Sequence, residues 1–539
     1  MRVLCLGLDG ADYHLVRDLL AQGRMPTVGR LAREGTFGPL RSTIPAVTPT
    51  AWSSFLTGLN PGGHGIFNFS SNPNRGVHRV ESAASRAGTP FWRPLGEVGV
   101  RSAYVTIPFT HPPEPIDGVV VTGYGGPERP TILPPAASER IYKAHPDLVT
   151  AYHPMAERWW EDFDGFTAKL LRHVDLVADV CRTAMDLEPD LGLLCVDFMS
   201  SDFAGHLGWN RLDPEHPAHD PAQAGDEVIR VYEAVDRACA ELIEHAERLY
   251  GEEPTVIALS DHGMKPVYWS FHVNRWLEDA GYLRYRRRSL QPLRGGRLDF
   301  LSRVDQRLAR TSHGYTRALD MLPGPHPAYD RSFADVDFTS TRAYSFATGG
   351  QIYLGETTGA REDRGFRDEL VAGLAEVRHP ETGEPAFDVR LKEELYHGRF
   401  VDKAPELVLL PRDERIHVES SRRPWTAVFD RHETLDPAHA YGYSGHHGLN
   451  GIIAAAGPGI RTADVPAGSE ITQMAATLLA LHGVASELEA PAIDAILDDE
   501  VLGEGRAVST TASRRTEEPV YSREEEALMI ERLRDLGYE

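Results

Sequence analysis

Short apolar runs separated by amphipathic segments recur through most of this 539-residue chain. Each run is five or six residues long, and continuous apolar runs of that length suit strands buried on both faces, as in a parallel sheet. We predict six such strands, at Val3–Leu8, Ser102–Thr106, Gly118–Thr122, Gly192–Val196, Thr255–Leu259 and Gly451–Ala456.

Helical patterns lie between the runs. The clearest extends from Glu227 to Tyr250, where apolar residues recur at helical spacing: Ile229, Tyr232, Val235, Ala238 and Leu242. Alternation of strand and helix predicts an α/β sandwich, with a mostly parallel central sheet flanked by helices.

Two regions depart from this rhythm. Residues 268–330 are rich in arginine and predict an inserted, cap-like segment, within which Leu308–Leu322 has a helical pattern. After Asp498 the chain turns polar, and then Ser522 and Glu525 form a capping box for a C-terminal helix. The predicted domains are a catalytic core at 1–267 and 331–490, an insertion or cap at 268–330, and a linker with the C-terminal helix at 491–539.

Charge and cysteine content exclude several classes of protein. The net charge of −23 argues against a nucleic-acid-binding surface, which needs a basic stripe. It is compatible with a small phosphorylated substrate, because bound metal cations can reverse the local field. Four cysteines without CxxC spacing predict neither a disulfide framework nor a thiolate zinc site.

The N-terminal apolar run is too short for a signal peptide, and no run approaches the length of a membrane span. We therefore expect a cytoplasmic protein without membrane association. The sequence predicts no particular oligomeric state.

Five segments place acidic, imidazole or hydroxyl side chains beside the predicted strands. In parallel α/β sheets, sites form at the carboxyl ends of the strands. Asp9 closes the first run, and Gly10 lets the backbone turn sharply, although a lone Asp there also serves as a helix cap. Asp202 and His206 form a DxxxH pair that faces one side of a helical turn and can bind one cation, with Asp197 as a nearby competitor. The same spacing is also common in surface contacts within a helix.

Two further segments carry histidine. Asp261 and His262 would point apart on a regular element, but the glycine turn that follows lets both face one metal. His446 and His447 lie between glycines, where paired histidines have little use in packing, so a ligand role for one of them is a hypothesis.

Thr48 is the candidate hydroxyl. Preceding Pro49, it fits a helix N-cap, and the same geometry places a hydroxyl beside free backbone N–H groups that attract phosphate. Thr50, Ser53 and Ser54 are rival hydroxyls on sequence alone. Three aspartates, three histidines and one hydroxyl make two clusters of oxygen and nitrogen donors, a mixture that suits zinc, with manganese or iron as alternatives.

The order of these motifs resembles the alkaline phosphatase superfamily, specifically its type I phosphodiesterase/nucleotide pyrophosphatase family. That family has DG near the N-terminus, a Thr nine residues before Thr-Gly, DxxxH, SDHGM and GxHG. All five occur here in order, with Thr48 nine residues before Thr57. The resemblance covers Met1 to Gly483 without the insertion, and the closer likeness is to bacterial proteins described only as predicted phosphohydrolases or phosphomutases of this superfamily.

The resemblance implies the roles of individual residues. One metal would be held by Asp9, Thr48, Asp261 and His262, and the other by Asp202, His206 and His447. His446 stands at a variable position of GxHG, and His64 would brace its loop. Nucleotide pyrophosphatases have a phosphate-binding Asn shortly after His-Gly, and Asn68 comes one position earlier than that residue.

The implied reaction is hydrolysis of phosphate esters, and of diesters in particular, through a covalent phospho-Thr48. One metal would lower the pKa of the Thr48 hydroxyl, and a second about 4 Å away would bind a phosphoryl oxygen and the leaving group. Phosphomonoesterase or phosphomutase activity and phosphonate hydrolysis are the alternatives on the same fold. A catalytically inactive metal-binding protein is the alternative from another class.

Overall fold

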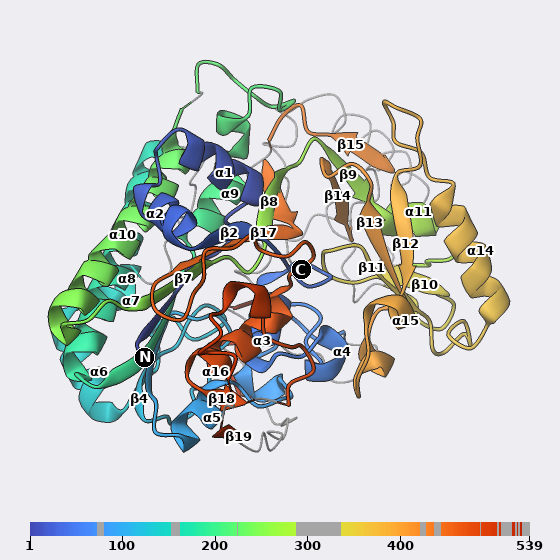
Figure 1. The fold of residues 1–539 in the computed structure, drawn as a ribbon. Coiled ribbons are helices and arrows are strands. Elements are labelled where there is room, and N and C mark those ends of the chain that lie inside the picture. Colours follow the sequence, from blue (N-terminus) through green and yellow to red (C-terminus); the bar gives the residue numbers. More distant parts are fainter. Residues whose placement is uncertain are drawn as a thin grey trace. The chain divides into compact units, whose positions relative to one another are not determined.

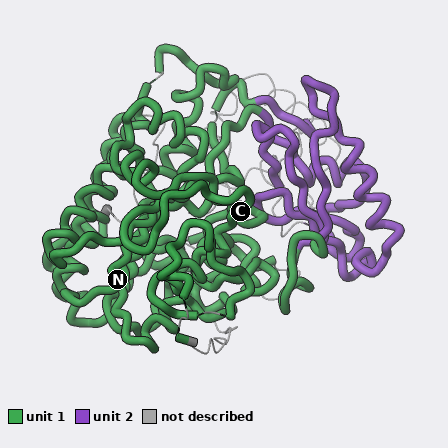
Figure 2. Tube along the Cα trace, viewed as in Figure 1, with its two compact units in different colours: residues 1–268, 392–404, 432–539 green, residues 269–391, 405–431 purple. Residues whose placement is uncertain are grey.

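The computed structural model of this chain divides into two compact units, which Figure 2 colours separately. Unit 1 comprises Met1–Tyr268, Lys392–Ala404 and His432–Glu539, and unit 2 comprises Trp269–Leu391 and Pro405–Arg431. The structure describes residues 1–72, 80–151, 162–223, 225–286, 336–420, 427–435, 443–485, 487–503, 506–507, 520–522, 525–526 and 529–530.

Unit 1 is built on an eight-stranded sheet. Its spatial order is β2 (Thr36–Arg41), β17 (Asn450–Ala456), β7 (Thr255–Leu259), β1 (Val3–Leu8), β6 (Leu191–Phe198), β3 (Arg101–Val105), β4 (Gly118–Val121) and β5 (Ile132–Leu133). Strands β7, β1, β6, β3 and β4 run parallel. Strand β17 is antiparallel to β2 and β7, and β5 is antiparallel to β4. All six strands predicted from the apolar runs occur in this sheet.

Helices cover both faces of the sheet (Figure 1), which confirms the predicted fold class. Strand β1 shows why both faces need helices. Its side chains alternate between the two faces, so Leu4, Leu6 and Leu8 enter one core while Val3 and Cys5 enter the other. The first core is completed by helices α1 (Tyr13–Ala21), α2 (Pro26–Glu34), α8 (Phe163–Leu187), α9 (Ser200–Leu212) and α10 (Glu227–Tyr250). The second is completed by α3 (Thr48–Thr57), α5 (Trp92–Glu97) and α16 (Met474–Leu481).

Helix α10 has the bounds that its periodicity predicts. Shorter elements of unit 1 are α4 (Pro61–His64), α6 (Pro135–Ala144), α7 (Leu148–Ala151), β8 (Gly263–Pro266), α15 (Lys392–Leu395), β16 (Gly445–Gly448), β18 (Val484–Ala485) and β19 (Arg506–Ala507). Strands β8 and β16 pair as an antiparallel ribbon in which His447 lies opposite Met264.

Unit 2 has its own core and two small sheets. The antiparallel sheet has the order β10 (Ala343–Ser345), β11 (Gln351–Leu354), β13 (Leu407–Pro411) and β12 (Phe387–Leu391). The other places β9 (Trp269–His272) between β14 (Ile416–Glu419) and β15 (Phe429–Arg431). Helices α11 (Val273–Asp279) and α14 (Arg364–Ala375) belong to this unit.

The extent of unit 2 differs from the predicted domain boundaries. The predicted core includes residues 336–391 and 405–431. In the structure, the strands of these residues pair with one another or with β9, and not with the central sheet. The unit begins at Trp269, one residue after the predicted start of the insertion. Residues 287–335, with the predicted helix Leu308–Leu322, lie outside the described residues.

Near the C-terminus, the predicted capping box is present. The N–H of Ser522 donates to Glu525 Oε2 over 2.8 Å, and the N–H of Glu525 donates to Ser522 Oγ over 3.2 Å. Much of the helix predicted to follow lies outside the described residues. The four cysteines are buried free thiols. Among the described helices, none combines the length and apolar character needed to cross a membrane.

Within unit 2, a buried histidine joins three strands. His272 ends β9, and its Nδ1 lies 3.2 Å from Glu419 of β14 while its Nε2 lies 3.2 Å from Asp430 of β15. Burial by itself would lower the pKa of His272, but the two carboxylates outweigh burial and raise this pKa to about 9. The imidazolium therefore stabilises the three-stranded sheet electrostatically.

We predict that this contribution to stability disappears in alkali. Because the folded pKa lies above the unfolded value of about 6.5, the stabilisation is complete below about pH 6.5 and is lost as the pH rises through about 9. The full effect is about 3 kcal/mol. The free energy of unfolding of wild type and of His272→Gln, measured in urea between pH 6.5 and 10, tests the prediction. Subtracting one free energy from the other cancels the contributions of all other titrating groups. Parallel pH profiles of the two proteins would contradict the prediction.

Candidate two-metal site

Three neighbouring strands of unit 1 end in acidic or imidazole side chains. Asp9 follows β1, Asp202 lies in the first turn of α9 after β6, and Asp261 follows β7. Because β7, β1 and β6 are adjacent and parallel, these carboxylates meet at one edge of the sheet. Gly10 makes the approach possible, since its φ is 68° and a Cβ there would lie 3.0 Å from Asp202.

The first cluster consists of Asp9, Asp261 and His262, whose ligand atoms lie within 4.8 Å of one another. His262 Nε2 is 3.6 Å from Asp9 Oδ1 and 3.3 Å from Asp261 Oδ2. All three side chains are fully buried.

The second cluster consists of Asp202, His206 and His447. Asp202 and His206 lie one turn apart on α9, as the DxxxH spacing predicts, with Oδ1 and Nε2 separated by 3.3 Å. His447 comes from β16, and its Nε2 is 3.4 Å from the same Oδ1 and 2.9 Å from His206 Nε2. The rings of His262 and His447 stack with centroids 3.8 Å apart, so the two clusters adjoin.

The three imidazoles share one arrangement. Each Nδ1 lies within 3.0 Å of a backbone carbonyl: Gly263 for His262, Gly445 for His206, and Ala46 for His447. A carbonyl only accepts, so each Nδ1 carries the proton and each Nε2 presents a lone pair. Metal-binding histidines have this outer-shell arrangement.

The donor atoms fit divalent cations. Asp9 Oδ1, Asp261 Oδ2 and Asp202 Oδ1 are buried and accept no hydrogen bond from the described residues. In the second cluster, two imidazole lone pairs and a carboxylate oxygen face one another, an arrangement that needs a cation between them. Ligands of a tetrahedral ion with bonds of about 2.0 Å lie about 3.3 Å apart, which matches the separations in both clusters.

The pKa shifts of the buried aspartates also favour bound cations. Burial raises the pKa of Asp9 well above its ordinary value, and the charge of Asp202 adds to this; burial and then Asp9 do the same to Asp261. Burial would also raise the pKa of Asp202, but positive charge on His206 and His447 would hold it well below its ordinary value, so this carboxylate favours a cationic neighbour. Buried carboxylates that repel one another are stabilised by a bound cation.

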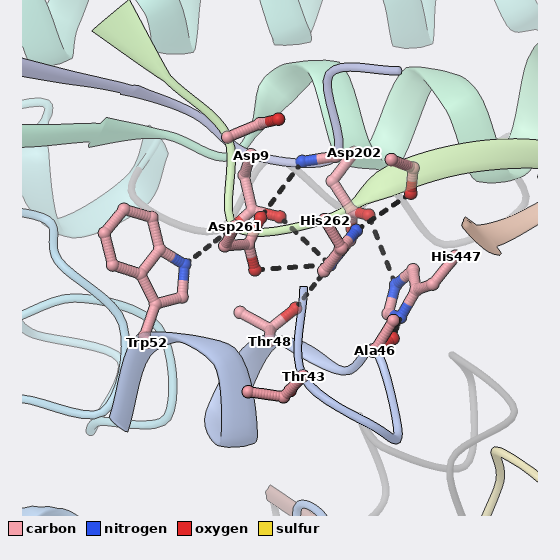
Figure 3. A network of polar contacts seen from close by, with 12 residues as sticks. Asp9, Thr43, Ala46, Thr48, Trp52, Asp202, Asp261, His262 and His447 are labelled. Atoms are coloured by element: carbon pink, nitrogen blue, oxygen red, sulfur yellow. Dashed lines mark hydrogen bonds and ion pairs between the residues drawn. The ribbon is translucent and has the colours of Figure 1, made fainter. Parts of the chain in front are cut away.

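Thr48 is the first residue of α3, and its Oγ lies 3.3 Å from His262 Nε2 (Figure 3). Val47 holds the N-cap position without a side-chain hydrogen bond, so the Thr48 hydroxyl is not used for capping. Of the rival hydroxyls, Ser54 pairs with His64, while Thr50 and Ser53 are buried and make no side-chain oxygen contact with the described residues of either cluster. The structure therefore brings Thr48 to the first cluster.

Asn68 has a local contact. Its carboxamide oxygen accepts a hydrogen bond from the N–H of Phe69 over 2.8 Å, and its side chain is buried. The substrate-binding role of Asn68 stays a prediction. His64 contacts Ser54 Oγ over 2.9 Å and accepts from the N–H of Ile66 over 3.1 Å, contacts that brace its loop.

Two residues of the site carry no signal in a linear motif. Trp52 of α3 donates its Nε1–H to Asp9 Oδ2 over 3.0 Å (Figure 3). Asp197 of β6 is fully buried beside Asp9, and burial followed by the charge of Asp9 raises its pKa. The signal for Asp197 is an acid at the end of an otherwise apolar run, which makes it a competitor of Asp202 in the sequence, whereas nothing in the sequence distinguishes Trp52 from an ordinary core residue.

We predict that Trp52→Phe weakens metal binding without unfolding the protein. The indole N–H holds one oxygen of Asp9 and leaves the other, Oδ1, toward His262. Loss of such an outer-shell hydrogen bond costs roughly 10- to 100-fold in metal affinity. Competition with a chromophoric chelator measures the affinity, and circular dichroism monitors the fold.

Trp92→Phe is the matched control. Trp92 is buried in the same core as Trp52, but its Nε1–H donates to Glu114 over 3.4 Å. Equal losses of metal affinity in the two variants would assign the effect to packing and not to the hydrogen bond with Asp9.

Similar folds occur among solved structures. Human ectonucleotide pyrophosphatase / phosphodiesterase 5 is 15% identical, with a TM-score of 0.50 over 93% of this chain and 100% of that one. An inactive murine form of the same protein, in complex with AMP, is 16% identical, with a TM-score of 0.50 over 92% and 100%. Phosphonoacetate hydrolase from Sinorhizobium meliloti 1021, in complex with phosphonoformate, is 16% identical, with a TM-score of 0.50 over 88% and 94%. These similarities show the fold.

No curated protein matches the sequence. The sequence profile described as type I phosphodiesterase / nucleotide pyrophosphatase matches residues 3–450, which confirms the resemblance seen in the motifs. The chain therefore belongs to the type I phosphodiesterase / nucleotide pyrophosphatase family, whose members are metal-dependent hydrolases of phosphate esters.

Proposed function

We propose that this protein hydrolyses small phosphate diesters in two steps through a covalent phosphothreonine at Thr48. Two divalent cations, zinc in the first instance, would be held by Asp9, Thr48, Asp261 and His262 and by the second cluster. The observation that carries the proposal is the Thr48 hydroxyl, 3.3 Å from the lone pair of His262 and free of any capping role. The AMP and phosphonoformate complexes of similar folds are consistent with a small phosphorus-containing substrate.

The chain positions the nucleophile before any substrate arrives. Thr48 begins a buried helix, so its backbone is fixed and the positive end of the helix dipole lies beside its oxygen. When bound, the cations supply Lewis-acid chemistry, which lowers the pKa of a hydroxyl and neutralises phosphoryl charge. The Nδ1–H groups of His206, His262 and His447 are held by carbonyls, and we infer that the hydroxyl proton leaves to solvent.

In the first step, Thr48 Oγ attacks phosphorus and the alcohol leaves. In the second step, water attacks the phosphothreonine, the bond from phosphorus to Thr48 Oγ breaks, and Thr48 regains its proton. The anionic phosphoryl group would lie between the helix N-terminus and the two clusters, where it meets positive charge in both steps.

We predict that Thr48→Ala lowers kcat for an aryl phosphate diester by at least about 1,000-fold, roughly 4 kcal/mol. The fold and most of the metal content should be retained, because the aspartates and histidines remain. Thr50→Ala is the control, since Thr50 is equally buried on the same helix. Loss of activity in Thr50→Ala but not in Thr48→Ala would show that the motif register is wrong.

We also predict that diesters are cleaved better than monoesters. A monoester dianion concentrates more charge on its terminal oxygens. Among the described residues, the ion-pair partners of Asp9, Asp202 and Asp261 are histidines, and no Arg or Lys pairs with these carboxylates. The arginines that could compensate are Arg275 and the run Arg286–Arg288. Arg275 is ion-paired with Asp279 over 2.7 Å, Arg286 is exposed, and Arg287 and Arg288 lie outside the described residues.

The measurement is kcat/KM for bis-p-nitrophenyl phosphate against p-nitrophenyl phosphate. A preference for the monoester of more than about tenfold, roughly 1.4 kcal/mol in transition-state stabilisation, would overturn the prediction and favour a phosphatase.

A further inference from the structure

One buried arginine of unit 1 lies outside both clusters. Arg86 is 4% exposed, and among the described residues its one hydrogen bond is donated from Nη1 to the carbonyl of Phe109 over 3.1 Å. A guanidinium has five N–H donors. Most of the hydrogen-bonding capacity of Arg86 therefore has no acceptor within the described part of the chain.

The charge of Arg86 is also poorly balanced. Burial lowers its pKa to about 10, and Glu114 opposes this from a distance, so the guanidinium is charged at neutral pH. The carboxylate of Glu114 already accepts from Arg93 over 2.8 Å and from Trp92 over 3.4 Å. Among the described residues, no carboxylate forms an ion pair with Arg86. A buried cation in that situation is costly to the fold, so its presence points to an anionic ligand.

The path of the chain places Arg86 at the edge of the sheet where the clusters lie. Val80 packs into the core on one face of the sheet, and Phe91 packs into the core on the other. The segment between them must therefore pass over an end of the strands. The N–H of Ala83 bonds to the carbonyl of His111, which, like Phe109, follows β3, so the crossing is at the carboxyl end of β3.

The loop that Arg86 contacts adjoins the first cluster. Strand β3 lies beside β6, and Thr106 at the start of this loop donates its hydroxyl to the carbonyl of Asp197 over 2.7 Å. Strand β1, which ends at Asp9, is two positions from β3, or about 10 Å at ordinary strand spacing. The loop that Arg86 contacts thus lies two strand positions from β1 at the same end of the sheet, a separation that suits a second group of a substrate whose phosphoryl group binds at the clusters.

We propose that Arg86 binds a second anionic group of the substrate, a carboxylate or phosphate carried on one ester arm. The proposal rests on the proposed function and narrows its substrate class to phosphate diesters with an additional negative charge. The planar guanidinium fork matches carboxylate and phosphate geometry, and Phe109 holds one branch of the fork in place.

Binding of inert probes tests this without turnover. Propylphosphonate, 3-phosphonopropanoate and ethane-1,2-diyl bisphosphonate share one phosphonate head group and a spacer of two methylenes, and they end in methyl, carboxylate or phosphonate. Calorimetry on the metal-loaded protein should show at least about tenfold tighter binding of one charged probe than of propylphosphonate, about 1.4 kcal/mol. The preferred charged probe identifies the second group as carboxylate or phosphate.

Arg86→Gln should remove this preference and change the affinity for propylphosphonate by less than about twofold. Arg86→Lys, which keeps the charge without the fork, should retain part of the preference and serves if the Gln variant does not fold. Arg93→Gln is the matched control, because Arg93 is an exposed arginine on the same stretch of chain, and it should keep the full preference.

Kinetics with p-nitrophenyl phenyl phosphate and p-nitrophenyl 4-carboxyphenyl phosphate give the second readout. Arg86→Gln should lower kcat/KM for the charged ester by about tenfold or more and leave the neutral ester within about twofold. Equal binding of all three probes by wild type, or an equal loss on both esters in Arg86→Gln, would overturn the proposal. If wild type cleaves neither ester and the probe preference still depends on Arg86, the proposed function fails and the role of Arg86 stands.

Discussion

The repulsion among buried carboxylates at the ends of β7, β1 and β6 is the interaction on which the rest of the site depends. Asp9, Asp197 and Asp261 all have pKa values raised first by burial and then by the charge of neighbouring aspartates, and no Arg or Lys among the described residues pairs with them. Hydrogen bonds from Trp52 and from the N–H of Gly10 offset only part of this cost. Cations that complete the clusters would therefore stabilise the fold as well as support chemistry.

The parts of this architecture that are encoded locally could be predicted from sequence. Each of the six apolar runs singled out in the sequence is a strand of the central sheet, and the periodicity of α10 gave both of its ends. The ligand candidates were identifiable because parallel strands bring their carboxyl ends to one edge, so polar residues after separate strands meet there. The order of the motifs, and not any one of them, identified the family.

The parts of the architecture that depend on pairing between distant segments could not be predicted from the sequence. Strand β17 was recognised as a buried strand, but its antiparallel direction is set by β7 and β2. The extent of unit 2 depends on strands that pair with one another and do not join the central sheet. Trp52 and Arg86 belong to no motif. Each is distinguished by being buried and by its hydrogen-bond partner, and both properties are known only from the fold.

An acidic protein that acts on anionic substrates must supply positive charge where it is needed and nowhere else. Here the surface charge is unfavourable, with a net −23. The candidate local sources are cations held by the two clusters, the N-terminus of α3 and a buried guanidinium, all at the carboxyl edge of one sheet. Because each would act in a desolvated setting, it would be worth more than a surface lysine, whose field salt would screen. Under the two proposals made above, bound cations would meet the reacting phosphoryl group, and the guanidinium of Arg86, on a loop about two strand positions away, would meet a second charge.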